Sequence, residues 1–189
     1  MKRNARIVAG LLCFFVMVSF IIPAVGFGDK AVQARKLKVR QKSLSSIIST
    51  SKSAGKGAQK WTEIRLEFAT KVKWVDELTV KYYALVKSAK SSEILYGDVT
   101  YINVPAGNKH ISSLFVHPTT MAKYGGKIKS VHCELWAQGE LRDVADFPSK
   151  PQKKWWEMKP SIKGVLFKRY FTPFALDAEY LGLAIKVEN

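Results

Sequence analysis

Apolar and polar residues alternate along several stretches of the chain, and this alternation predicts β-strands. The clearest stretch is residues 61–68, where Ile64 and Leu66 alternate with Glu63 and Arg65. A period of two places one set of side chains on a core face and the other in water. The same pattern, or a high content of β-branched and aromatic residues, predicts six further strands at residues 77–87, 94–104, 109–116, 127–138, 165–171 and 180–187.

Proline and glycine residues punctuate the middle of this series. Pro105–Asn108 predicts a tight turn, so residues 94–104 and 109–116 are expected to pair as a hairpin. Pro118–Tyr124 predicts one short helical turn, because proline favours the first position of a helix and two glycines follow.

The alternation stops over residues 139–161, which predicts a long connection that is functional or wraps an edge. About seven short strands with almost no helix predict an all-β fold, an antiparallel immunoglobulin-like β-sandwich over residues 61–189. Parallel pairing would need crossover helices, and no helical pattern supplies them.

The N-terminus has the composition of an export signal. Basic residues at Lys2, Arg3 and Arg6 precede an uncharged apolar run, Ile7–Ile22, and small residues follow at positions 24–26. Residues 1–28 are therefore predicted to be a signal peptide or membrane anchor. The run is shorter than the roughly 20 residues that span a bilayer comfortably. Both outcomes stay open: a cleaved leader, or an anchor that holds an exported protein in the periplasm or at the outer surface.

Residues 29–60 carry half of the net charge of +16, with nine Lys and Arg residues against one acid. The segment is rich in lysine and serine, and Leu37, Leu44 and Ile48 have helical spacing. We therefore predict a basic flexible or helical linker. Its charge suits anionic lipid or acidic glycan, or keeps a linker soluble. Export makes nucleic acid an unexpected partner.

Few residues offer catalytic or metal-binding chemistry. His132 and Cys133 are adjacent on a predicted strand, so their side chains point to opposite faces and cannot share one metal. Cys133 is expected to be a small buried hydrophobe, with an intermolecular disulfide as the alternative. Nucleophile-elbow and phosphate-loop motifs are absent from the sequence. We predict no enzyme, no cofactor and no metal site, with a hydrolase that uses a carboxylate pair as the least favoured alternative.

The aromatic residues of the long connection are the main candidates for a contact site. Trp155 and Trp156 follow Lys153 and Lys154, and these four residues predict a partner hot spot or a stacking surface for a sugar. In the alternative interpretation, one tryptophan closes the end of the sandwich and the other shields an edge strand.

Two segments, Lys73–Lys87 (KWVDELTVKYYALVK) and Phe171–Tyr180 (FTPFALDAEY), resemble the immunoglobulin-like, pilus-associated proteins of Akkermansia-type Verrucomicrobia. The resemblance covers roughly residues 61–189. It implies an exported sandwich domain in a Gram-negative cell envelope, in a setting related to type IV pili. The order of the N-terminal residues differs from that of a pilin subunit, which favours an accessory role.

Together these features predict a non-enzymatic envelope or surface protein. It would act by protein–protein contact or structural assembly, with other envelope or pilus-related proteins as partners. Its contacts would come from exposed sheet edges, through strand addition, and from the Trp155-Trp156 loop. The alternative function is a carbohydrate-binding module that docks glycans through the same loop.

Overall fold

The computed structural model describes residues 31–43, 60–88, 91–124, 126–148, 150–151, 153–180 and 182–186. The predicted signal or anchor at residues 1–28 lies outside these segments, as do residues 44–59 of the predicted linker. No helix within the described segments is long and apolar enough to cross a membrane.

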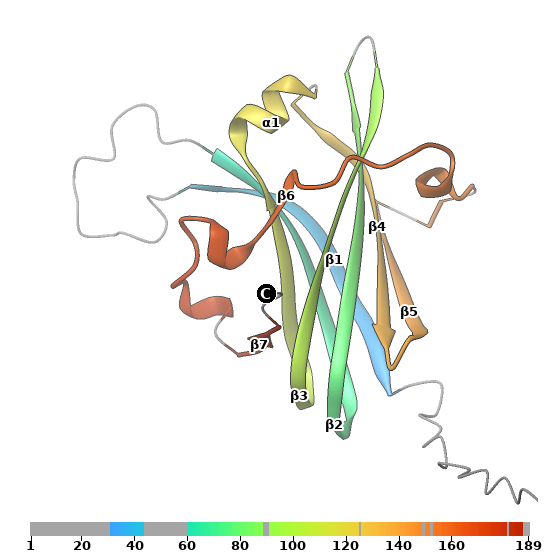
Figure 1. Cartoon of the computed structure of the whole chain (residues 1–189), viewed down its shortest axis with the longest axis vertical. Coiled ribbons are helices and arrows are strands. Elements are labelled where there is room, and N and C mark those ends of the chain that lie inside the picture. Colours follow the sequence, from blue (N-terminus) through green and yellow to red (C-terminus); the bar gives the residue numbers. More distant parts are fainter. Residues whose placement is uncertain are drawn as a thin grey trace, which may run out of the picture.

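Seven strands in the described residues form one antiparallel sheet (Figure 1), which confirms the all-β prediction. Its order is β5-β4-β2-β3-β6, with β1 paired to β2 and β7 paired to β3. The strands are β1 (Val32–Ser43), β2 (Lys60–Lys87), β3 (Ser92–Val116), β4 (Ile128–Ala137), β5 (Glu140–Phe147), β6 (Leu166–Lys168) and β7 (Ala184–Ile185). Short helical turns occur at α1 (Pro118–Lys123), η2 (Trp155–Glu157), η3 (Arg169–Phe171) and η4 (Ala178–Tyr180).

The two longest strands, β2 and β3, bend and give the sheet two layers. Residues 60–70 of β2 pair with β1 and with the end of β3, whereas residues 75–87 pair with the start of β3 and with β4. The predicted strands at 94–104 and 109–116 are therefore one bent strand, and the expected hairpin between them is wrong. Both halves pair with β2, since Thr70 lies opposite Gly107 and Trp74 opposite Pro105.

The core lies between the two layers and uses the alternating apolar positions. A buried cluster joins aliphatic and aromatic side chains of both halves of β2 to β3 and β4; its largest fully buried members include Tyr82, Phe68, Ile64, Leu66, Leu78, Leu95, Leu114 and Leu135. Gly97 pairs regularly with Tyr82, and a Cβ at this glycine would lie 2.7 Å from Cβ of Leu166. Glycine therefore permits the close approach of β6.

Strand β1 corrects the predicted linker over residues 32–43. From Lys36 onward, cations alternate with Leu37 and Val39, which is the period of a strand, and these two residues pack against the core. Val32 at the start of the strand is 1% exposed. The high lysine content hid this pattern, because every second side chain of β1 carries charge.

The C-terminal residues 169–180 cover the outer face of the layer that contains β1. Phe174 is fully buried there and stacks on Phe115, with ring centroids 5.1 Å apart. Glu63 and Arg65 are consequently 0% and 4% exposed, so the prediction that they face water is wrong. The alternation correctly predicted which side chains of this strand face the core. It could not show that a segment far away in the sequence covers the opposite face, which carries Glu63 and Arg65.

The covered face contains a charged network, which we call the Glu63 cluster. The Glu63 carboxylate accepts hydrogen bonds from Ser113 Oγ at 2.8 Å, Tyr180 Oη at 2.7 Å and Arg40 Nε at 2.5 Å. Lys42 Nζ lies 2.6 Å from Asp177 Oδ2. The cations of β1 thus neutralise acids of the same domain. The sequence instead predicts these cations on a flexible or helical linker, where they attract acidic partners or keep the linker soluble.

Glu179 extends the Glu63 cluster to the molecular surface. It pairs with Arg65, and its Oε2 lies 2.9 Å from Arg40 Nη2. Burial acts to raise the pKa of this carboxyl, but hydrogen bonds from Arg40 and Arg65 outweigh it and lower the pKa to about 2. Glu179 therefore stays ionised through the mildly acidic range, and its pairs hold the C-terminal segment on the sheet.

Strand β5 corrects the first part of the long connection predicted at residues 139–161. Gln138 and Gly139 both have positive φ, 54° and 76°, and join β4 to β5 as a two-residue hairpin turn. The strand alternates less clearly than β4 because a register shift interrupts it between Leu141 and Asp143. The predicted helical turn at Pro118–Tyr124 is confirmed as α1.

Candidate functional site

The ring of Trp156 lies flat on the imidazole of His132, with centroids 3.5 Å apart and planes at 6°. Trp155, its neighbour in η2, stands perpendicular at 89°, with ring centroids 5.6 Å apart. The two indoles therefore do not form one flat stacking surface. Trp156 thus packs on a side chain of β4 and is partly buried.

The orientation of His132 is fixed by the carboxylates around it. The ring is 3% exposed, and Nδ1 lies 2.7 Å from Oδ1 of Asp146, its direct cross-strand partner on β5. Nε2 faces Glu134 Oε1 at 3.6 Å, and Glu134 Oε2 accepts a hydrogen bond of 2.8 Å from Trp136 Nε1. Carboxylates thus face both ring nitrogens, and the locked imidazole supports Trp156 from below.

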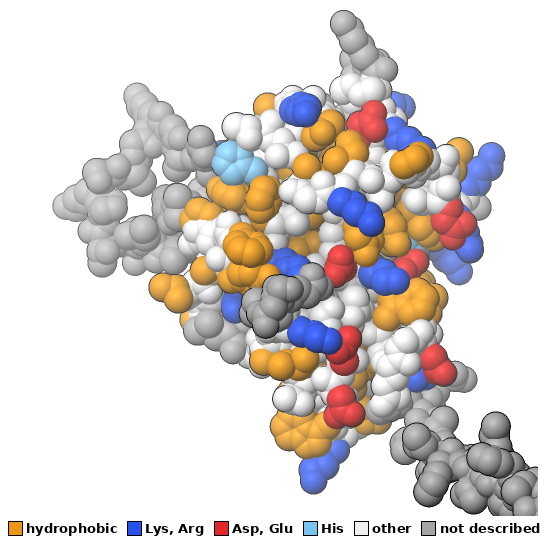
Figure 2. Space-filling model, viewed as in Figure 1, with side chains coloured by type: hydrophobic (Ala, Val, Ile, Leu, Met, Phe, Trp, Pro, Cys, Tyr) orange, Lys and Arg blue, Asp and Glu red, His pale blue; other side chains and the backbone are white. Residues whose placement is uncertain are grey.

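A depression of about 290 Å³ opens beside this stack, and we call it the Trp156 groove. It is lined by strands β4 and β5 and by the connection that carries η2, with Leu141 and Val144 as its exposed apolar side chains, 48% and 39% exposed. The lining residues are His132, Glu134, Leu141, Val144, Asp146, Lys150, Pro151, Lys153, Lys154, Trp156 and Glu157. Figure 2 shows charged and apolar side chains mixed at this edge, on the right of the view.

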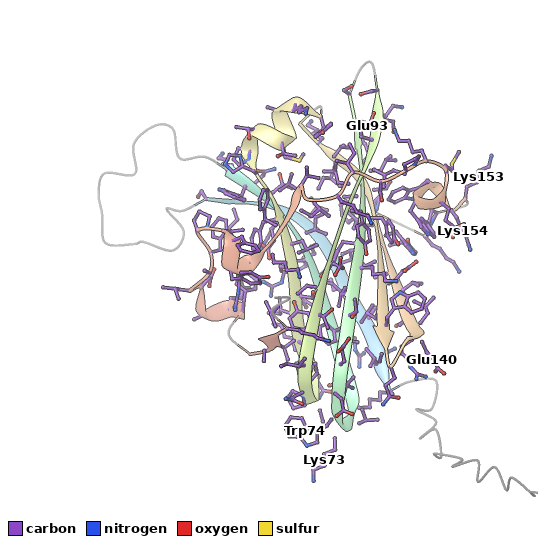
Figure 3. The ribbon with its side chains drawn as sticks, viewed as in Figure 1. Lys73, Trp74, Glu93, Glu140, Lys153 and Lys154 are labelled. Atoms are coloured by element: carbon purple, nitrogen blue, oxygen red, sulfur yellow. The ribbon has the colours of Figure 1, made fainter. Side chains whose placement is uncertain are left out.

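Charge is distributed unevenly between the floor and the rim of the groove. The floor carboxylates, Asp146 and Glu134, are 11% and 14% exposed and face His132. The rim carries exposed lysines, and Figure 3 shows Lys153 and Lys154 at this end of the molecule. Lys154 pairs with Glu157 at 3.2 Å, whereas within the described segments Lys150 and Lys153 have no ion-pair partner. A partner would therefore meet apolar and cationic groups first.

The structure brings the four predicted contact residues together on one short segment. Lys153 and Lys154 are exposed, and Trp155 and Trp156 are partly buried. The sequence interpretation missed His132, Asp146, Leu141 and Val144. The alternation of Val144 and Asp146 with the core-facing Ala145 and Phe147 is the signal that could have identified β5. Nothing local in the sequence places Trp156 on His132.

The other candidates for chemistry are dispersed. His110 lies near the Pro105 carbonyl, and His117 caps α1 through Nδ1. Across the described ranges, no group of three or more His, Cys, Asp or Glu residues could hold a metal ion. Cys133 is fully buried; burial, and then the charges of Asp146 and Glu134, raise the pKa of its thiol. The thiol is thus protonated at neutral pH, which suits a packing role.

One contact limits how β5 can bind a partner. The backbone N–H of Ala34 in β1 donates to Asp143 Oδ2 at 2.8 Å. Strand β1 therefore approaches the middle of β5, where an added strand would otherwise pair. Contact at this edge is expected to use side chains of the groove more than backbone hydrogen bonds.

Comparison with known proteins places the chain in a family. A protein-family model with the short description "-like" matches residues 28–180. The chain belongs to this family. A crystal structure of a protein from Akkermansia muciniphila is also similar, with a TM-score of 0.66 and 20% sequence identity, over 84% of this chain and 94% of that chain. At this identity the similarity shows the fold alone. No curated protein matches the sequence.

Proposed function

We propose that the chain is an exported, non-enzymatic protein of the cell envelope or surface, associated with pili, that acts by protein–protein contact through the Trp156 groove. The observation that carries this proposal is the combination of a supported tryptophan with exposed Leu141 and Val144 beside it. Tryptophan is enriched among the residues that dominate binding energy at protein interfaces, and a rigid ring loses little entropy when it binds.

The composition of the groove favours a protein partner over a sugar. Carbohydrate binding through the Trp155-Trp156 loop is supported less well, because His132 covers one face of Trp156 and Trp155 stands perpendicular to it. Exposed Lys150 and Lys153 at the rim favour a partner surface that combines acidic and apolar residues.

Photo-crosslinking in the native host tests this function. A photoreactive residue at Leu141, in the full-length chain, is expected to give adducts with envelope or pilus-related proteins. The matched control carries the same residue at Lys123, which is exposed on α1, away from the groove. Adducts that form equally at both positions, or recovery of the chain as a free cytoplasmic monomer, would contradict the proposal.

A further inference from the structure

The bend of β2 forms an exposed tip at the lower end of the molecule in Figure 1, away from η2. Trp74 is 52% exposed, and Lys71 and Lys73 are exposed beside it. Figure 3 shows Lys73 and Trp74 projecting from this tip, and Figure 2 shows apolar and basic side chains together there. We call Lys71, Lys73 and Trp74 the β2 tip.

The β2 tip is held rigidly although its side chains are exposed. Val75, the next residue, is fully buried, and Thr70 on the other side donates its hydroxyl to the Pro105 carbonyl oxygen at 2.5 Å. An exposed tryptophan that follows two exposed lysines is therefore presented on a fixed bend. Nearby acids reduce the positive charge of the β2 tip only partly. Glu77 is paired with Lys186 at 2.7 Å, which leaves Asp76 as the exposed acid beside the two lysines.

The described chain begins at this same end. The backbone N–H of Lys71 donates to the Ala31 carbonyl at 2.9 Å, and Val32 pairs with Thr70. In the sequence, the apolar run Ile7–Ile22 ends nine residues before Ala31. Nine residues reach at most about 30 Å when fully extended. If the run stays in a membrane, the β2 tip is therefore tethered close to the bilayer surface.

We propose that the β2 tip docks on the surface of a bilayer that contains anionic lipid, into which residues 7–22 insert as an anchor. Tryptophan prefers the level of the lipid headgroups, where its ring is partly apolar and its N–H is hydrated. Each lysine near an anionic surface adds to the attraction. In Figure 3, Lys73 and Trp74 lie at the lower tip and Lys153 and Lys154 on the right flank, so the lysine rim of the groove is set apart from the β2 tip. The proposal rests on retention of residues 7–22 as an anchor and is independent of the partner that binds the groove.

Fluorescence quenching by brominated lipid tests the docking. The full-length chain is reconstituted in vesicles of phosphatidylcholine and phosphatidylglycerol that carry bromine just below the headgroups. We expect a quenched tryptophan component that disappears in Trp74→Phe. The matched control, Trp155→Phe, alters a tryptophan of η2, away from the β2 tip, and is expected to keep that component.

A charge-reversal variant tests the role of the lysines. In Lys71→Glu/Lys73→Glu, the docking equilibrium in anionic vesicles is expected to fall by at least about 30-fold, because each lysine contributes about fivefold near an anionic surface. Both lysines are exposed, so the fold should be unaffected. Equal quenching in the wild type and Trp74→Phe would overturn the proposal. It would also be overturned if the chain loses residues 7–22 by signal cleavage and the remaining protein does not bind the vesicles. Crosslinking at Leu141 would remain possible in either case.

Discussion

Glu63→Ala is expected to lower the free energy of unfolding by about 3 kcal/mol. This carboxylate is fully buried and accepts hydrogen bonds from Arg40, Ser113 and Tyr180. Removing it leaves the partners unsatisfied, and breaking a buried ion pair typically costs about 3–5 kcal/mol. The lower end of that range applies here because the side chain of Arg40 is 41% exposed and can be rehydrated.

Urea unfolding of the purified chain measures this loss, with Glu77→Ala as the matched control. Glu77 also forms an ion pair, with Lys186, but both side chains are about half exposed. Such surface pairs contribute about 0–1 kcal/mol. If both variants lose the same free energy of unfolding, the carboxylate of Glu63 is solvated like that of Glu77, which would contradict the structure.

Phe174→Ala is expected to be at least as damaging, with a loss of about 3–4 kcal/mol. The side chain is fully buried, stacks on Phe115 and meets the edge of Trp61 with centroids 6.2 Å apart. Truncating a buried phenylalanine to alanine removes apolar burial and leaves a cavity, which costs about 3–5 kcal/mol.

The matched control for Phe174 lies in the same segment. Phe171 is 68% exposed, so Phe171→Ala should change the free energy of unfolding by less than about 0.5 kcal/mol. If both variants unfold at the same denaturant concentration as the wild type, residues 169–180 do not belong to the core, and the covered face of the sheet is misassigned.

Strands with regular alternation could be predicted from the sequence, because their register depends on local periodicity. Ile64, Leu66 and Phe68 face the core as expected, and the all-β antiparallel class follows from the number of such stretches. The bend that joins the halves of β2 could not be predicted. At residues 71–74 the pattern is interrupted as it would be at a turn, and only pairing with β3 shows that the strand continues.

Highly charged strands were the elements that the sequence analysis predicted least well. From Lys36 onward, β1 places a cation at every second position, and this composition suggested a linker. Arg40 and Lys42 nevertheless meet acids that lie far away in the sequence. Strand β5 was hidden by its register shift, which interrupts the alternation between Leu141 and Asp143. Overall charge is a poor guide where the opposite charges that neutralise it come from distant segments.

The candidate site could be predicted in part. A Trp155-Trp156 pair in a lysine-rich connection signals a contact residue, because large aromatic side chains outside a strand pattern need a separate explanation. Its support could not be predicted, since His132 and Asp146 come from two strands whose pairing is set by the whole sheet. The sequence therefore indicates where a contact occurs more readily than what fixes its geometry.

The affinity of a Trp156→Ala variant tests the central claim most directly, once the partner that crosslinks at Leu141 is purified. The account predicts binding at least about 30-fold weaker than that of the wild type, which is the effect of removing an interface hot spot. An unchanged unfolding midpoint would confirm that the fold is intact. The variant Trp74→Ala, which removes an exposed tryptophan outside the groove, should bind like the wild type. Trp156→Ala that binds as tightly as the wild type would contradict the account.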